Sequence, residues 1–274
     1  LIRRQRQMCI RDRIGMDHMM FLGNTLGEIA GNKAGIIKPN TLVVSAKQEP
    51  EAEAVVKEVS KAKNATLSIV DPEEIKDVHY GYERQSFSYK NWKNIEISLA
   101  GTYQIKNAAL ALEAVEALRR LGFELSEENV RKGMAGADWR GRFSVIHKDP
   151  VVVIDGAHNP AAATVLKESL ETYFKGKNLY YIFGVFADKD YEKVIELTAP
   201  LAKRIVTVQT PDNPRALPAE ALKKAVEKVN PNVTSADSVA KAVEEVKEMT
   251  TKDDVVIVFG SLSFLSLADE AWNR

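Results

Sequence analysis

The chain has 274 residues, more than one domain usually contains, which predicts two compact units that each bury a core. Lysine plus arginine (38) equals aspartate plus glutamate (38), so no net basic field attracts nucleic acid or an anionic membrane, and a small or metal-neutralised ligand is expected. The single cysteine, Cys9, excludes an internal disulfide or a thiolate metal site and suits the cytoplasm. No apolar run reaches the roughly 20 residues of a membrane span, so we expect a soluble protein.

The first half of the chain begins with LIRRQRQMCIRDR, which has no clear strand or helix period and is interpreted as a tail or non-native sequence. Residues 41–47 and 65–71 are predicted strands, and the helix between them presents Ala54, Val55, Val59 and Ala62 on one face. This pattern predicts a β-α-β unit.

The next segment alternates over residues 86–101 well enough for edge strands. A long helix follows from residue 103 and ends at Gly122. Ser126 is the expected N-cap of another helix, with Glu128 in its first turn.

From residue 143 the pattern changes to continuous apolar strands separated by amphipathic helices. Strands of this kind are covered on both faces, which predicts a doubly wound, mostly parallel sheet. We place the junction between the two domains near residues 139–142. The predicted strands are VVVIDG, LYYIFGV, RIVTVQT and DDVVIVFGS, and the helices include PAAATVLKESLETYF and YEKVIELTAPLAK.

The segment VVVIDGAHNP is the strongest candidate for a ligand site, because ligands of open parallel sheets bind beyond the carboxyl ends of the strands. Asp155 ends a buried strand, Gly156 permits a tight turn, and Asn159 with Pro160 can begin a helix. Asp155 and His158 are then expected to face a crevice. The alternative is that Asp155 and Asn159 only cap the turn and the helix, and the spacing leaves both readings open.

Three further polar residues are equally ambiguous from spacing alone. Arg142 at the junction can reach a phosphate or remain a solvated surface cation. Asn107 lies beside an alanine-rich face and can serve a ligand or the backbone, and His18 can be a metal ligand or structural. No GxGxxG fingerprint occurs in the sequence. The residues by themselves support an α/β protein with one ligand crevice between two domains.

Six ordered motifs carry a more specific message: DHMMFLGNTLGEIAGNKAGIIKP, LAGTYQIKNAALAL, WRGRF, DGAHNP, FADKD and FGSLSFL. Together they resemble the folylpolyglutamate synthase family of the Mur ligase superfamily, including its bifunctional dihydrofolate synthase form, from about Ile14 to the C-terminus. The resemblance implies an ATP-dependent ligase that phosphorylates a folate or dihydropteroate carboxylate and lets the amine of L-glutamate attack the acyl phosphate. Such chemistry depends on positioning and on charge stabilisation.

The resemblance also implies the residue roles. His18 matches the histidine that ligates Mg²⁺, and Lys33 matches the lysine that is carbamylated; both are taken as catalytic. Asn107, Arg142 and Asp155 match positions that bind ATP, and His158 is carried over as a residue of the same pocket. A monovalent cation such as K⁺ is a further implied cofactor, and the intact enzyme is expected to be a cytoplasmic monomer without nucleic acid or membrane partners.

The chain departs from the family pattern in three places. It lacks the glycine-rich P-loop that holds the phosphates, Asn32 stands where an acidic residue commonly precedes the lysine, and polar residues precede IGMDH where an apolar strand is expected. We therefore expect a truncated ligase, inactive alone: a non-family leader over 1–13, the C-terminal part of a P-loop-type central domain over 14–141, and a Rossmann-like C-terminal domain over 142–274. The alternatives are a Mur peptidoglycan ligase and a non-catalytic nucleotide-binding module.

Overall fold

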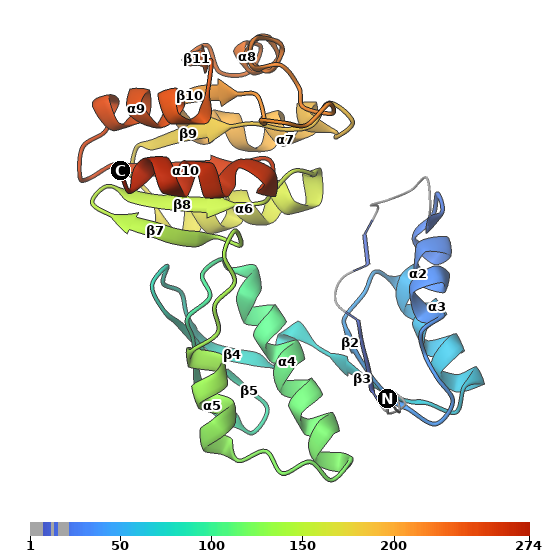
Figure 1. Cartoon of the computed structure of the whole chain (residues 1–274). Coiled ribbons are helices and arrows are strands. Elements are labelled where there is room, and N and C mark those ends of the chain that lie inside the picture. The colour runs from blue at the N-terminus through green and yellow to red at the C-terminus, as the bar shows by residue number, and fades with distance from the viewer. Residues whose placement is uncertain (1–7, 12–13, 16–21) are drawn as a thin grey trace. The chain divides into compact units, whose positions relative to one another are not determined.

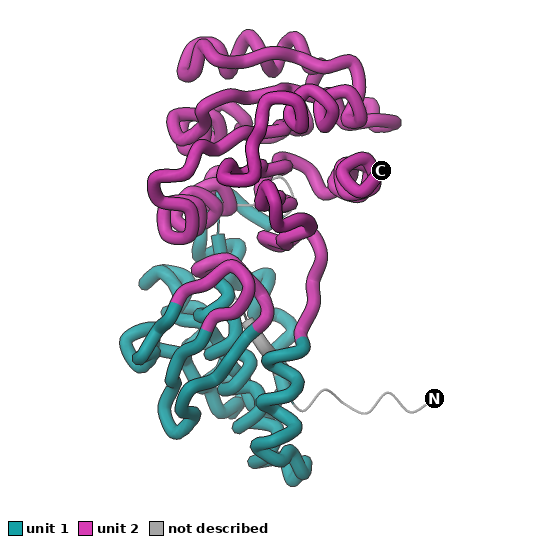
Figure 2. Tube along the Cα trace, turned by 90° about the vertical axis from the view of Figure 1, so that its left-hand side faces the viewer, with its two compact units in different colours: residues 1–79, 86–97, 104–136 teal, residues 80–85, 98–103, 137–274 magenta. Residues whose placement is uncertain are grey.

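The computed structural model describes residues 8–11, 14–15 and 22–274. The chain divides into two compact units (Figure 2). The first comprises the chain up to residue 79 together with 86–97 and 104–136, and the second comprises 80–85, 98–103 and 137–274. Within this described part, no helix combines the length and apolar character needed to cross a membrane.

The second unit is built on a six-stranded sheet with strand order β11-β10-β9-β12-β8-β7 (Figure 1). Every neighbouring pair is parallel except β7 and β8, so the predicted mostly parallel sheet is confirmed. Asp155, Phe259 and Phe183 lie in register at the carboxyl ends of β8, β12 and β9. The strands are β7 (Ser144–Lys148), β8 (Val151–Asp155), β9 (Leu179–Phe183), β10 (Ala202–Val208), β11 (Val233–Ala236) and β12 (Val255–Phe259).

Helices cover both faces of this sheet, as the doubly wound prediction requires. On one face Val153, Tyr181 and Ile257 pack with α6, α7 and α8. On the other, Val152 and Ile182 pack with α9 and α10. Successive strand residues therefore enter opposite cores, which is why these strands read as unbroken apolar runs. The helices are α6 (Pro160–Tyr173), α7 (Tyr191–Thr198), α8 (Ala219–Glu227), α9 (Val239–Met249) and α10 (Leu265–Trp272).

The first unit contains two three-stranded sheets. One is parallel, with order β1-β2-β3, and the other has the order β4-β5-β6, with β4 and β5 antiparallel. The predicted β-α-β unit is β2-α3-β3. The elements are β1 (Met8–Arg11), α2 (Leu26–Ala34), β2 (Leu42–Ala46), α3 (Pro50–Ala62), β3 (Thr66–Val70), β4 (Ile75–His79), β5 (Gln85–Tyr89), β6 (Trp92–Ile97), α4 (Tyr103–Arg120) and α5 (Glu127–Ala135).

A buried carboxylate joins three elements of the first unit. Glu113 of α4 is 3% exposed and accepts hydrogen bonds from the hydroxyls of Ser68 on β3 and Tyr89 on β5, the latter at 3.0 Å. The Lys90 ammonium lies 2.8 Å from the same carboxylate. Burial opposes ionisation of Glu113, but the hydrogen bonds from Lys90, Ser68 and Tyr89 outweigh it and hold its pKa below the ordinary value.

Two connecting loops, 80–85 and 98–103, pack on α6 within the second unit. Gln85 is 2% exposed, accepts from the Tyr173 hydroxyl at 2.7 Å, and donates to the carbonyls of Leu99 and Gly101. The Thr102 N–H donates to Ser169 Oγ at 3.0 Å. The ring of Tyr82 lies 5.3 Å from that of Phe174. Buried polar bonds and ring packing thus fix both loops to one helix.

Two sequence interpretations are corrected by the structure. Residues 8–11 of the presumed tail form β1, which pairs in parallel with β2, so the tail interpretation is wrong for these residues. The buried face of α3 is Ala52, Val56 and Ser60, whereas Ala54 and Ala62 are exposed. The prediction of the helix was right, but the predicted buried face was wrong, because that prediction counted only apolar residues and polar Ser60 is buried.

Candidate functional site

The carboxyl end of β8 carries the candidate site. The strand stops at Asp155, and the chain turns through Gly156 to α6, whose N-cap is Asn159. The Asn159 side chain accepts from the Ala162 N–H at 2.9 Å, and Pro160 occupies the first turn. The predicted start of a helix at Asn159 and Pro160 is therefore confirmed.

Asp155 is 6% exposed, and both of its carboxylate oxygens accept backbone hydrogen bonds. Oδ1 accepts from the Ala157 N–H and Oδ2 from the Phe143 N–H, each at 2.7 Å. Burial is the main influence on this carboxyl and raises its pKa to about 6, although the two N–H donors and the charge of Arg142 act in the opposite direction. The capping alternative weighed for Asp155 thus describes its contacts in this structure.

Arg142 lies between the two anchored residues Gly141 and Phe143. It is exposed, and its Nη1 is 2.9 Å from the point that a Cβ on Gly156 would occupy. No hydrogen bond or ion pair within 4 Å links its guanidinium to another residue in the ranges the structure describes. A cation in this position keeps its N–H donors for a ligand, and guanidinium groups suit phosphates.

His158 lies in the same turn and is partly buried. Its Nδ1 is 2.8 Å from the Gly156 carbonyl oxygen and must donate to it, so in the neutral ring Nε2 is an acceptor. This bond fixes the plane of the ring. Arg142, Asp155 and His158, which the sequence placed 16 residues apart at most, therefore share one end of the second unit's sheet.

The other predicted site residues lie in the first unit or outside the described part. Lys33 is in the last turn of α2, a helix that begins with a capping box between Thr25 and Glu28, and it is partly buried. Asn107 is in α4, where its Nδ2 donates to Gln104 Oε1 at 2.8 Å. His18 lies outside the described residues. Among residues that are described, no three His, Cys, Asp or Glu side chains gather to hold a metal ion.

Sequence reasoning missed Leu262, which begins the short 3-10 helix η3 (Leu262–Phe264) after β12. A Cβ on Gly156 would lie 2.5 Å from Leu262 Cδ2, and one on Gly141 would lie 3.0 Å from the same atom. Leu262 is 50% exposed and so places an apolar surface beside Arg142. The FGSLSF motif contained this residue, but spacing along the chain gave no sign that it packs on WRGRF and DGAHNP.

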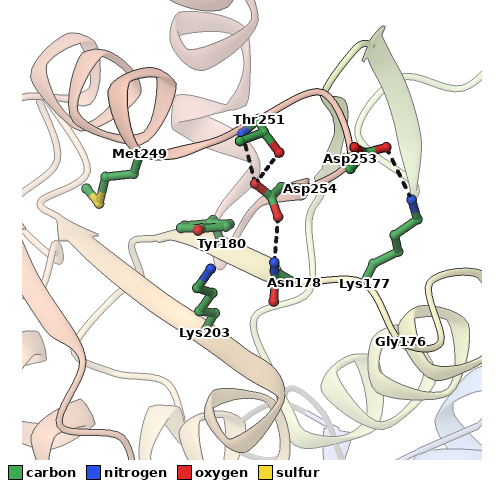
Figure 3. Close-up of a pocket in the computed structure, with 9 residues that line it drawn as sticks. All are labelled: Gly176, Lys177, Asn178, Tyr180, Lys203, Met249, Thr251, Asp253 and Asp254. Atoms are coloured by element: carbon green, nitrogen blue, oxygen red, sulfur yellow. Dashed lines mark hydrogen bonds and ion pairs between the residues drawn. The ribbon is translucent and has the colours of Figure 1, made fainter.

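A cavity of about 380 Å³ lies at the amino ends of the strands of the same sheet (Figure 3). It is lined by residues that precede or begin β9, β10 and β12, among them Asn178, Lys203 and Asp254. Asp254 is 5% exposed and accepts from the Thr251 N–H and from Asn178 Nδ2, each at 2.8 Å. Because parallel sheets bind ligands at their carboxyl ends, this cavity is not the candidate site.

Comparisons with known proteins show what the chain is similar to. Residues 141–262 match a family model described as the Mur ligase, glutamate ligase domain. The chain is 35% identical over 259 residues to the dihydrofolate synthase/folylpolyglutamate synthase of Bacillus subtilis (strain 168), covering 92% of this chain and 60% of the relative. It is 32% identical over 211 residues to the folylpolyglutamate synthase of Lacticaseibacillus casei, covering 75% of this chain and 49% of the relative.

Solved structures show the same likeness. The folylpolyglutamate synthase of Mycobacterium tuberculosis, complexed with ADP and AMPPCP, has a TM-score of 0.86 at 27% identity, with 98% of this chain and 64% of that chain covered. E. coli FolC in complex with DHPP and ADP has a TM-score of 0.81 at 27% identity, with 97% and 61% covered. The chain thus spans less than two thirds of the length of these relatives. Residues 141–262 thus match the glutamate ligase domain of Mur ligases, and the chain is similar to folylpolyglutamate and dihydrofolate synthases over part of their length.

Proposed function

We propose that the chain is part of an ATP-dependent ligase that adds L-glutamate to a folate, or to dihydropteroate, through an acyl phosphate. The relatives named above include enzymes called folylpolyglutamate synthase and dihydrofolate synthase, and two of the solved neighbours hold ADP. As further parts of this proposal, the intact enzyme is a cytoplasmic monomer, and its C-terminal domain begins at residue 142.

The observation that carries the proposal is the unpartnered, exposed Arg142 at the carboxyl end of a parallel sheet. Its guanidinium forms no ion pair within 4 Å with a described carboxylate and lies beside the apolar surface of Leu262, while His158 lies in the adjoining turn. This arrangement is suited to a nucleotide with its phosphates and its base. Asn107 and Lys33 are proposed as nucleotide and carbamate residues of the first unit. ATP supplies the phosphoryl group that activates the carboxylate.

Mg²⁺ is proposed through His18, with K⁺ as a further cation; among the described residues, no three His, Cys, Asp or Glu side chains gather to hold a metal ion. The contribution proposed for the described part of the chain is therefore to bind and orient the nucleotide.

The test is calorimetric titration of ATP with Mg²⁺ into the chain and into Arg142→Gln. Loss of one charged phosphate contact is expected to weaken binding by about tenfold. Arg140→Gln is the matched control, because Arg140 lies two residues away but pairs with Asp269 at 2.8 Å. This control should retain affinity within about twofold. Equal affinities of wild-type chain and Arg142→Gln would remove the nucleotide role.

A further inference from the structure

Two backbone turns are tied together at the end of β8, and Arg142 lies inside one of them. The Phe143 N–H, which follows Arg142, donates to Asp155 Oδ2 at 2.7 Å. The Gly141 carbonyl, which precedes Arg142, accepts from the Gly156 N–H at 2.9 Å. Arg142 is therefore flanked on both sides by a residue that is bonded to the end of the strand, so its backbone has little freedom.

The conformation of this turn needs support. Phe143 has φ 50°, in the left-handed region that a bulky residue with a Cβ adopts only at a cost. Its ring is 1% exposed and lies 5.4 Å from the ring of Tyr173. Burial of the ring and the hydrogen bond from its N–H to Asp155 together offset the strain. Without the carboxylate, the turn could relax to an ordinary conformation and carry Arg142 with it.

The guanidinium itself packs against Gly156, at the end of the same strand. Its Nη1 and Leu262 Cδ2 lie 2.9 Å and 2.5 Å from the place of a Cβ on Gly156, so both side chains fill the space that a side chain at 156 would take. Asp155 forms no ion pair with Arg142 within 4 Å, and each of its carboxylate oxygens accepts a hydrogen bond from a backbone N–H. The carboxylate thus holds the turn and leaves the guanidinium donors available.

We propose that Asp155 is a positioning residue that acts on the nucleotide through Arg142, by fastening the Gly141–Phe143 turn to the end of β8. This proposal rests on the proposed nucleotide-binding role of Arg142. A cation that is already held in its binding geometry loses less conformational freedom when the phosphate arrives, so the benefit of Asp155 appears as affinity.

A double-mutant cycle tests the proposal, using Arg142→Gln, Asp155→Asn and the pair in the whole chain. Titration with ATP and Mg²⁺ should show that Asp155→Asn weakens binding by about tenfold in the wild-type background and by less than about twofold in Arg142→Gln. The same factor in both backgrounds would show that Asp155 acts independently of Arg142 and would overturn the proposal.

Asp254→Asn is the matched control, since Asp254 is 5% exposed, accepts hydrogen bonds from Asn178 Nδ2, the Thr251 N–H and the Thr251 hydroxyl at 2.8–2.9 Å, and lies at the amino end of β12 in the same sheet. It removes a comparable carboxylate from the same unit, so a general loss of stability would affect it equally. We expect it to keep the wild-type affinity for ATP. A loss equal to that of Asp155→Asn would assign the effect to stability alone.

A second variant reaches Arg142 by another route if Asp155→Asn folds poorly. Gly156→Ala leaves Asp155 intact, but its methyl group must displace the ends of the Arg142 and Leu262 side chains. Both are flexible ends, so the fold should tolerate the change. We expect it to weaken ATP binding in the wild-type background and to cause no further loss of affinity in the Arg142→Gln background. If the losses of affinity from the two substitutions were fully additive, the contact between the guanidinium and Gly156 would not matter for binding, which would contradict the proposal.

A measurement without nucleotide separates this proposal from the proposed function. Nitrogen-15 relaxation of the Arg142 Nε in the free chain should show greater mobility in Asp155→Asn than in the wild type and in Asp254→Asn. Unchanged mobility overturns the positioning role whatever the chain binds. If the mobility rises while ATP binds neither the wild type nor any variant, the nucleotide role fails and the link between Asp155 and Arg142 stands.

Discussion

Replacing Glu113 by glutamine should destabilise the first unit by about 2 kcal/mol. The carboxylate accepts from Ser68, Tyr89 and Lys90, and a hydrogen bond to a charged group contributes about 1.5–3 kcal/mol against about 0.5–1.5 for a neutral one. Three bonds would thus lose roughly 1 kcal/mol each. The Lys90 side chain is 37% exposed, so solvent screens most of the free energy that its bond contributes. The expected loss is therefore that of about two hydrogen bonds.

The assay is native-state hydrogen exchange of the α4 amides with increasing urea, which reports the first unit by itself. Glu116→Gln is the control on the same helix: Glu116 is 37% exposed and pairs with Arg119 at 2.9 Å. Glutamine keeps an oxygen that can accept from Trp92 Nε1, 3.1 Å away, so the change should cost at most about 1 kcal/mol. The pKa of Glu113 is lowered in the folded unit, so its stabilisation is present above its ordinary value of 4.5 and is lost as pH falls through the folded value. A cost no greater than that of Glu116→Gln, or one that does not shrink in acid, would refute this reasoning.

Three further outcomes are expected. In a chimera that supplies the N-terminal portion of the Bacillus subtilis relative, Lys33→Ala should lose ligase activity and regain part of it with a short added carboxylate; full activity without the additive contradicts the carbamate role. The 274-residue chain alone should release no phosphate from ATP with Mg²⁺, glutamate and a reduced folate, because its sequence has no P-loop, and turnover near 1 per second would disprove this. Burial raises the pKa of Asp155 to about 6, so its protonated form favours the fold: stability from this group is greatest in acid and falls as pH rises through 6, a trend that Asp155→Asn should abolish.

Elements with their own local signals could be predicted from the sequence. Ser126 and Asn159 cap helices as expected, because each side-chain oxygen accepts from the backbone N–H three residues later. The four inner strands of the second unit, β10, β9, β12 and β8, could be predicted from their apolar runs. The edge strands β7 and β11 were not predicted, since they are only partly buried and lack such runs.

Contacts between distant segments could not be predicted from the sequence. β1 is a strand because it pairs with β2, more than 30 residues later, and the arginine-rich segment around it has no strand period. The bond from the Phe143 N–H to Asp155 involves a backbone group, which has no sequence signature. The sequence could thus name Arg142 and Asp155 as candidates, but not the link between them.

The loops 80–85 and 98–103 make the second unit discontinuous in the gene, and this limits how it can be inherited or exchanged. A fragment that begins at residue 137 would leave Tyr173 without Gln85 and Ser169 without Thr102, and would uncover the ring of Phe174. A recombination event that swaps only the C-terminal half between relatives would join one lineage's α6 to another lineage's loops. Substitutions on α6 and in these two short loops should therefore vary together among relatives, and a separately expressed domain should be designed with both loops grafted onto it.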